Sequence, residues 1–297
     1  MGYATGYETG YELCIGDRAY SSWSLRGWLL FEAFGIGCAL TRTRLYEPGF
    51  AQTLARFAPA RTVPALRLPE GVVIGDSLAI AEELATRHPE AGHWPTDPKA
   101  RAIARHLAAE MHASFTALRG HCAMNLRDCY TDCAPPAAVL ADLARLEELW
   151  AWARAECDVG PWLCGDYSVA DVFFAPVAAR IAGHALPVSP AAQAYVAAHF
   201  AHLPFRRWRA MAQVDGADQP AYGRDWPTGD WARPEVLPSV PLATGPSINA
   251  ACPYSGLPVT HYLRVKGQVL GFCNAFCRDK TGADPEAWPQ AMALLEP

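Results

Sequence analysis

The stretch Tyr20-Ser21-Ser22-Trp23-Ser24-Leu25-Arg26-Gly27-Trp28-Leu29-Leu30 places three serines between a short apolar strand and a helix. Residues 11–15 before it alternate like a half-buried strand, and Leu25, Trp28 and Leu29 recur at helical spacing. The hydroxyls therefore lie at a helix N-terminus, where free N–H groups and the helix dipole favour negative charge by roughly 0.3–1 kcal/mol. Serine is also an ordinary N-cap residue, so the stretch alone is compatible with a structural role.

The residues around this stretch predict two domains of different class. The first alternates strands and helices, with strands over residues 11–15, 39–46, 65–68 and 72–74 and helices over residues 22–34, 48–58 and 77–88. This βαβαββα order, a βαβ unit followed by αββα, predicts a thioredoxin-like domain with a mixed sheet. From Pro98 onward, long periodic stretches predict an all-helical domain, with helices in residues 98–127, 135–156, 168–183 and 191–211.

We expect five segments along the chain. These are a disordered arm (1–10), the thioredoxin-like domain (11–92), the all-helical domain (98–213), a Pro/Gly-rich linker (214–248) and a small cysteine-bearing extension (249–297). The prolines of the linker predict an extended rather than a floppy connection.

Composition excludes several classes of protein. The net charge of −5 with scattered Lys and Arg offers no basic face for nucleic acid. No apolar run approaches the ~18–20 residues of a membrane span, and the first ten residues lack the basic start and apolar stretch of a signal peptide. We therefore expect a cytoplasmic protein, in which the ten cysteines are buried thiols or metal ligands rather than disulfides.

Four segments, in order, resemble the glutathione transferase family, especially its zeta-like bacterial members. Residues 21–26 resemble the serine active-site loop, and residues 61–66 resemble the loop with a cis Val-Pro bond. Residues 75–80 resemble the motif that grips the γ-glutamyl end of glutathione, and residues 168–171 the capping box of a buried helix. The resemblance covers roughly residues 11–213 and implies glutathione as co-substrate.

The resemblance implies that Ser21 donates a hydrogen bond to the glutathione sulfur and favours its thiolate, whose ordinary pKa lies near 8.5. Ser22 is the second candidate, or else the helix N-cap, and Tyr20 is a competing donor. Arg26, one turn further on, would add positive potential. Trp23 stands where related proteins carry a catalytic cysteine, which disfavours cysteine chemistry.

The same resemblance assigns the ends of glutathione. Val63 would pair through its backbone with the cysteinyl unit if the Val63-Pro64 bond is cis, although a trans proline at the start of a strand is also sound. Arg61 would bind the glycine carboxylate. Ser77 suits the γ-glutamyl carboxylate and Asp76 its ammonium, although this pair is also a common N-cap.

In the second domain, Ser168 and Asp171 form a capping box that we expect to be structural. Five aromatic residues are expected in its core: Trp150, Trp152, Trp162, Phe173 and Phe174. We expect His106, His112 and His121 to be exposed or hydrogen-bonded rather than catalytic.

The extension carries Cys252, Cys273 and Cys277, the first two on either side of a hairpin predicted over residues 262–272. Three converging thiolates on a ribbon with few apolar residues favour a zinc site, and the spacing resembles a TRASH/YHS metal-binding knuckle. Ser255 stands where four-cysteine versions have a second cysteine, so His261, Asp279 or water would complete the shell. Reduced cysteines packed by Phe272, Phe276 and Trp288 are the alternative.

The sequence thus predicts an enzyme, a glutathione transferase that directs glutathione thiolate at a small electrophile and forms a homodimer. The alternatives are a zeta-type cis-trans isomerase or dehalogenase that uses glutathione, or a non-catalytic scaffold with a metal-binding or metal-sensing tail.

Overall fold

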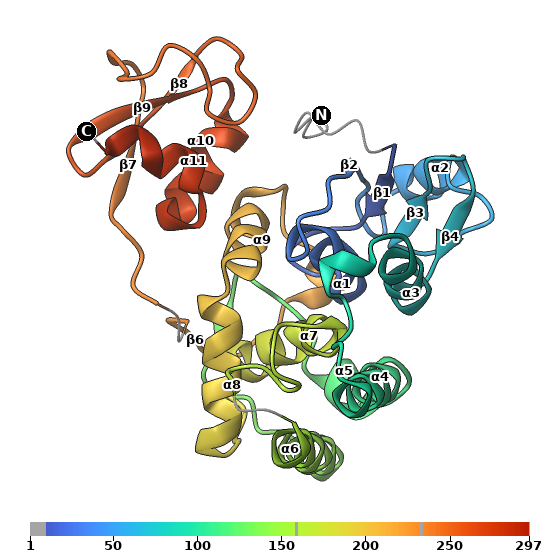
Figure 1. Cartoon of the computed structure of the whole chain (residues 1–297). Coiled ribbons are helices and arrows are strands. Elements are labelled where there is room, and N and C mark those ends of the chain that lie inside the picture. Colours follow the sequence, from blue (N-terminus) through green and yellow to red (C-terminus); the bar gives the residue numbers. More distant parts are fainter. Residues whose placement is uncertain (1–9, 158–159, 232–233, 297) are drawn as a thin grey trace.

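The computed structural model describes residues 10–157, 160–231 and 234–296 (Figure 1). The predicted disordered arm lies outside the described residues, apart from Gly10. Four strands form the first sheet in the order β2-β1-β3-β4. They are β1 (Glu12–Ile15), β2 (Ala39–Arg42), β3 (Ala65–Arg67) and β4 (Val73–Gly75). β1 runs parallel to β2 and antiparallel to β3, as a βαβ unit followed by a β-hairpin requires.

Three helices complete the first domain: α1 (Ser22–Glu32), α2 (Gly49–Ala55) and α3 (Ser77–Arg87). α1 packs against α3 on one side and against the second domain's α7 on the other. The predicted thioredoxin-like fold is confirmed. β2 is shorter than the predicted strand, because the Asp17 carboxylate accepts a hydrogen bond from the Leu45 N–H (2.7 Å) and draws that segment out of the sheet.

The second domain is all-helical, as predicted. Its helices are α4 (Pro98–Ala113), α5 (Thr116–His121), α6 (Ala137–Glu156), α7 (Val169–Gly183), α8 (Pro190–Ala201) and α9 (Leu203–Val214). Two of the predicted stretches, 98–127 and 191–211, each divide into two helices. The first breaks at Phe115, which has φ 61°, and the second at His202, where extended backbone precedes Leu203-Pro204. Pro204 cannot continue the preceding helix, because it has no N–H to donate.

Helix α7 is buried on all sides and forms the centre of the core. Its capping box is present, and Asp171 also accepts hydrogen bonds from the Leu163 N–H (3.2 Å) and the Tyr195 hydroxyl (2.8 Å). The core prediction is wrong for Trp152, which is 39% exposed because it lies on the outer face of α6, whereas Trp150 on the inner face is 3% exposed.

The segment predicted as a linker contains regular structure. β6 (Thr228–Gly229) pairs with β5 (Cys129–Tyr130) of the second domain, and a short 3₁₀ turn covers Pro220–Tyr222. β7 (Ser239–Leu242) pairs with β8 (His261–Val265), which pairs with β9 (Gln268–Phe272) around the Lys266-Gly267 turn. The proposed boundaries between segments stay a prediction.

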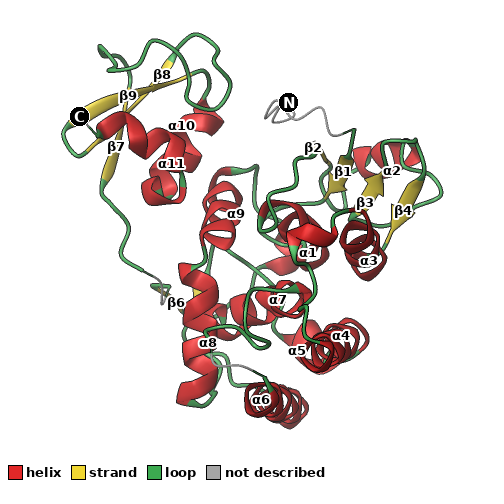
Figure 2. Cartoon of the chain, in the orientation of Figure 1, coloured by secondary structure: helices red, strands yellow, loops and turns green. Residues whose placement is uncertain are grey.

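One face of this sheet packs against α10 (Ala275–Ala283), which is followed by α11 (Pro289–Met292), and the buried residues of the extension are continuous with the core of the two domains (Figure 2). Leu263, Leu270 and Phe272 are buried there. The expectation of a ribbon with few apolar residues is therefore wrong, because the "linker" supplies a third strand. The extension packs on α9, where Arg206 Nε and Nη2 donate to the two oxygens of Asp284 (2.9 and 2.7 Å). Among the described residues, no helix has the length and apolar content that crossing a membrane demands.

The hydrogen bonds of Asp171 generate a stability prediction. Asp171→Ala should lower the free energy of unfolding by more than about 3 kcal/mol, because it leaves several buried donors without an acceptor. Tyr195→Phe removes one of these donors and should cost about 0.5–1.5 kcal/mol. Urea unfolding measures both, with exposed Asp166→Ala as the control. Equal effects for Asp171→Ala and Asp166→Ala would contradict the assigned role.

Candidate functional site

A cleft of about 1090 Å³ lies between the two domains. Its walls come from the N-terminus of α1, the loop before α2, the Val63-Pro64 loop, α5 and α7. Tyr20, Ser21, Ser22, Val63 and Asp76 all line it, so the structure brings together most of the residues that the sequence singled out.

Ser21, not Ser22, is the N-cap of α1. Its backbone is extended, and its Oγ accepts from the Ser24 N–H (3.3 Å) and hydrogen-bonds to the Ser24 Oγ (2.8 Å). Ser22 is the first residue of the helix, and its Oγ accepts a hydrogen bond from Arg180 Nη2 at 2.8 Å. Because Ser22 Oγ accepts from Arg180, the Ser22 hydroxyl proton points away from that guanidinium group. The Ser21 hydroxyl donates to Ser24 Oγ, so it must rotate before it can donate to a ligand.

Three arginines surround these serines. Arg26 and Arg119 share one aromatic partner: both guanidinium groups contact the Trp23 ring (4.9 and 4.4 Å), and Arg26 also contacts Phe173 (4.7 Å). Arg180 donates to the Cys122 carbonyl as well as to Ser22. Within the described residues, none of the three forms an ion pair with a carboxylate.

Burial lowers the pKa of two of these guanidinium groups. It lowers the pKa of Arg26 to about 9, with Arg180 and Arg119 contributing repulsion, and it lowers the pKa of Arg180 to about 10. Both groups are still cations at neutral pH. The cleft therefore holds concentrated positive charge that is not neutralised by the protein, and this favours an anionic ligand.

Tyr20 is engaged elsewhere. Its hydroxyl donates to Asp218 (3.0 Å), its ring stacks on Tyr222 (4.9 Å), and burial together with the Asp218 hydrogen bond raises its pKa to about 12. This contact makes Tyr20 a poorer thiolate donor than either serine.

The Val63-Pro64 peptide bond is cis, as the resemblance implies, and both residues line the cleft. Arg61 is exposed and does not line it. Its assignment to the glycine carboxylate stays a prediction.

Asp76 and Ser77 begin α3. Asp76 is the N-cap with φ 71°, its carboxylate accepts from the Leu78 N–H (2.7 Å), and His112 Nε2 lies 3.1 Å from its other oxygen. Ser77 is fully buried, and its Oγ has no hydrogen-bond partner in the described part of the chain. A buried hydroxyl without a partner is costly unless a ligand completes it.

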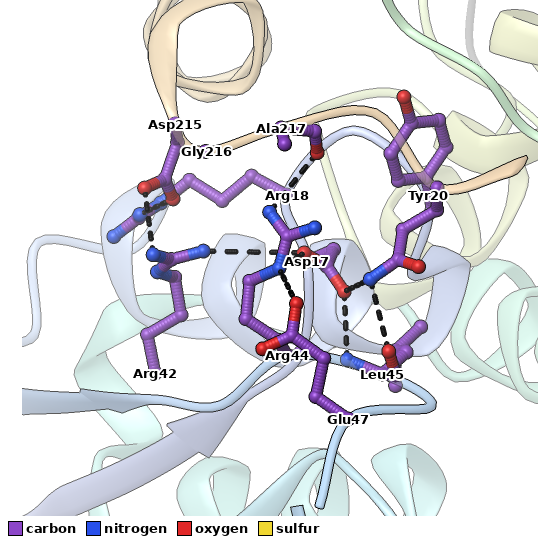
Figure 3. Close-up of polar contacts among 12 residues, drawn as sticks. Asp17, Arg18, Tyr20, Arg42, Arg44, Leu45, Glu47, Asp215, Gly216 and Ala217 are labelled. Carbon is purple, nitrogen blue, oxygen red and sulfur yellow. Dashed lines mark hydrogen bonds and ion pairs between the residues drawn. The ribbon is translucent and has the colours of Figure 1, made fainter. Parts of the chain in front are cut away.

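A polar network joins the first domain to the segment after α9 (Figure 3). Asp17 accepts from Gln219 Nε2 (3.2 Å) as well as from Leu45, and Arg44 Nη1 donates to the Ala217 carbonyl (3.0 Å). Asp215 pairs with Arg18 and with Arg42 (3.3 Å). These contacts hold residues 215–222 against the cleft, and Tyr222 lines it.

The extension brings its three cysteines together. The sulfur atoms of Cys252, Cys273 and Cys277 all lie within 4.8 Å of one another, and Cys273 and Cys277 are 3.9 Å apart. Ser255 Oγ donates to the Cys273 sulfur (3.2 Å). A hydrogen bond from Cys277 lowers the pKa of Cys252 below its ordinary value. His261 and Asp279 lie outside this group, since His261 pairs with Thr260 and Asp279 with Arg278.

Comparison with known proteins agrees with this geometry. Residues 20–87 match the family "Glutathione S-transferase, N-terminal domain". The chain is 34% identical to maleylacetoacetate isomerase of Rattus norvegicus over 94 residues, which is 31% of this chain and 42% of the rat enzyme. The alignment therefore spans less than half of that relative.

Solved structures extend the likeness of fold to the helical domain. A glutathione transferase homologue from Burkholderia gl BGR1, with bound glutathione, superposes with a TM-score of 0.51 at 22% identity, covering 68% of this chain and 98% of that one. A tau class glutathione S-transferase from mango gives 0.54 at 18% identity, covering 68% and 94%. Residues 20–87 are thus similar to the N-terminal domain of glutathione S-transferases, and the chain shares its fold with the solved glutathione transferases.

Arg119, Arg180 and Tyr222 are among the cleft residues that sequence reasoning missed. Arg180 could have been found as the one cation in the middle of the apolar run 169–183. Arg119 and Tyr222 gave no such signal, because the turn at Phe115 and the network in Figure 3 place them.

The network predicts that Asp17→Ala loosens one wall of the cleft. Backbone amides in residues 43–47 and 215–222 should exchange faster with solvent, because the Leu45 N–H and the Gln219 amide lose their shared acceptor. Exchange measured by mass spectrometry gives the result. Glu47→Ala, which removes only a surface partner of Arg44, serves as the control. Unchanged protection of these amides in Asp17→Ala would show that Asp17 does not hold residues 215–222 in place.

Proposed function

We propose that this protein is a glutathione transferase, which binds glutathione in the cleft and activates its thiolate for attack on an electrophilic carbon. One observation carries the proposal: paired serines at the N-terminus of α1 face a cleft beside buried Arg26 and Arg180, which form no ion pair with a carboxylate of the described residues. The thiol proton leaves to water on binding, and the sulfur then forms a bond to carbon as the leaving group departs with its electron pair.

The ligand's position follows from the same residues. The γ-glutamyl carboxylate lies at the N-terminus of α3, where Ser77 Oγ would complete its hydrogen bonding and Asp76 would pair with the ammonium. Val63 would pair with the cysteinyl backbone. The sulfur then reaches Ser21 and Ser22, where the arginines favour its negative charge.

A glutathione-dependent isomerase of zeta type is the second candidate. The 34% identity of 94 residues of this chain to the rat maleylacetoacetate isomerase favours it. In such a reaction the thiolate adds to a conjugated double bond, the bond rotates, and the thiolate leaves again. Assays with an aryl halide and with a maleyl ester, each with glutathione, distinguish transfer from isomerisation.

We also propose that the three cysteines of the extension bind zinc, completed by water, as their mutual distances suit thiolate ligands. The likeness to a TRASH/YHS knuckle, the homodimer and the cytoplasmic location stay predictions. Light scattering on purified protein tests the dimer.

Binding tests the ligand assignment. Glutathione should bind with micromolar to millimolar affinity, and Ser77→Ala should weaken binding by roughly 1–3 kcal/mol, because a charge-assisted hydrogen bond is lost. Calorimetry measures both, with Thr86→Ala on the exposed face of the same helix as the control. The proposal fails if the unmodified protein does not bind glutathione.

The serines are distinguished by the pKa of bound glutathione, read from thiolate absorbance against pH. Ser21→Ala should raise that pKa and lower turnover by about ten- to a thousandfold, with little change in affinity. It should also cost about 1 kcal/mol of stability as a lost N-cap, which Ser22→Ala should not. A raised thiol pKa in Ser22→Ala alone would assign the donor role to Ser22.

Metal content tests the extension. Cys252→Ser should lose about one zinc per chain relative to the unmodified protein, whereas Cys38→Ser, outside any such group, should not. Removing this metal should speed amide exchange near residues 252–257 and 273–277 without unfolding the sheet, because apolar burial continuous with the rest of the core also holds the sheet. Equal zinc content in both variants would show that the cysteines only pack.

A further inference from the structure

A second group of metal-ligating side chains lies in the helical domain, away from the extension. The ligand atoms of Cys122, Cys133 and His184 all lie within 4.8 Å of one another. They come from three separate segments: the C-terminus of α5, the loop before α6 and the C-terminus of α7. Cys122 and His184 are buried, and Cys133 is partly buried.

The sulfur separation suits a shared metal rather than a disulfide. Cys122 Sγ and Cys133 Sγ are 3.9 Å apart. Two thiolates at about 2.3 Å from a tetrahedral zinc are separated by about 3.8 Å, whereas a disulfide needs about 2.05 Å.

The imidazole of His184 is oriented as a ligand. Its Nε2 lies 2.9 Å from the Ala123 carbonyl, which can only accept, so Nε2 carries the proton. Nδ1 then presents a lone pair, and it is buried without a hydrogen-bond partner among the described residues. Metal-binding histidines usually have this arrangement: one ring nitrogen donates to a backbone carbonyl, and the other binds the ion.

We propose that Cys122, Cys133 and His184 form a zinc site, with water in the fourth position. The described residues offer no fourth His, Cys or carboxylate ligand within the group. Two thiolates neutralise the charge of Zn²⁺, and two sulfurs with one imidazole are a common ligand set for this ion.

The site would stabilise one wall of the cleft. The Cys122 carbonyl accepts from Arg180, whose other nitrogen donates to Ser22 Oγ at 2.8 Å. Arg119, Gly120 and Ala123, beside Cys122 in the chain, line the cleft. The ion would therefore fix the segment that holds Arg180 against Ser22. This consequence holds whichever ligand the cleft binds.

The test uses full-length protein in which Cys252, Cys273 and Cys277 are all serine, so that only this site is left. After incubation with Zn²⁺ and desalting, it should retain about one zinc per chain by elemental analysis. Co²⁺ in place of Zn²⁺ should give a thiolate-to-cobalt charge-transfer band. Adding Cys133→Ser or His184→Gln should remove most of the metal, whereas adding Cys129→Ser, a buried cysteine outside the group, should not.

Alkylation of the unmodified chain provides a measurement that needs no substitution. Bound zinc should slow the modification of Cys133, read by mass spectrometry, relative to chelator-treated protein. The proposal is overturned if the triple-serine protein retains no metal, if His184→Gln leaves the metal content unchanged, or if Cys133 is alkylated as fast with Zn²⁺ as in chelator-treated protein.

Discussion

The burial of Arg26 and Arg180, to which no carboxylate of the described residues is paired, is the constraint around which the cleft is built, and partly buried Arg119 adds a third positive charge. An unpaired buried charge is costly, and the protein offsets this cost only with the rings of Trp23 and Phe173, backbone carbonyls and the Ser22 hydroxyl. None of these groups carries a negative charge. An anionic ligand beside the serines would supply it, so the ligand and the fold stabilise each other.

This arrangement depends on both domains. Arg26 comes from α1, while Arg119 and Arg180 come from the helical domain, and the packing of α1 against α7 brings them together. The contacts of Asp17 and Asp215 then hold the chain after α9 across the same cleft. A pocket formed at such a junction can change in shape through the second domain while the wall that the first domain supplies stays fixed.

Much of this could be predicted from the sequence. Strand and helix order in the first domain follows from local periodicity, and the capping box of α7 follows from four consecutive residues. Ser21, Val63 and Asp76 were found to line one cleft because each sits at the end of an element whose position the fold determines. Three cysteines converge in the extension because a hairpin joins them.

Other features depend on contacts between distant segments, which no local pattern encodes. Residues 239–242 looked like linker because Pro241 interrupts any strand pattern, yet they form an edge strand, where proline is tolerated. The group Cys122, Cys133 and His184 spans more than sixty residues, and its spacing matches no simple motif. Trp152 was expected in the core from its residue type alone, whereas its place on α6 decided its exposure.

The central claim is that the cleft binds glutathione as a thiolate. Calorimetry at pH 7 in buffers of different ionisation enthalpy measures the protons released on binding. Because the free thiol, with a pKa of about 8.5, is mostly protonated at this pH, glutathione should release close to one proton per site, and S-methylglutathione, which has no thiol, should release none. Equal proton release by the two ligands, or binding of neither, would contradict the account.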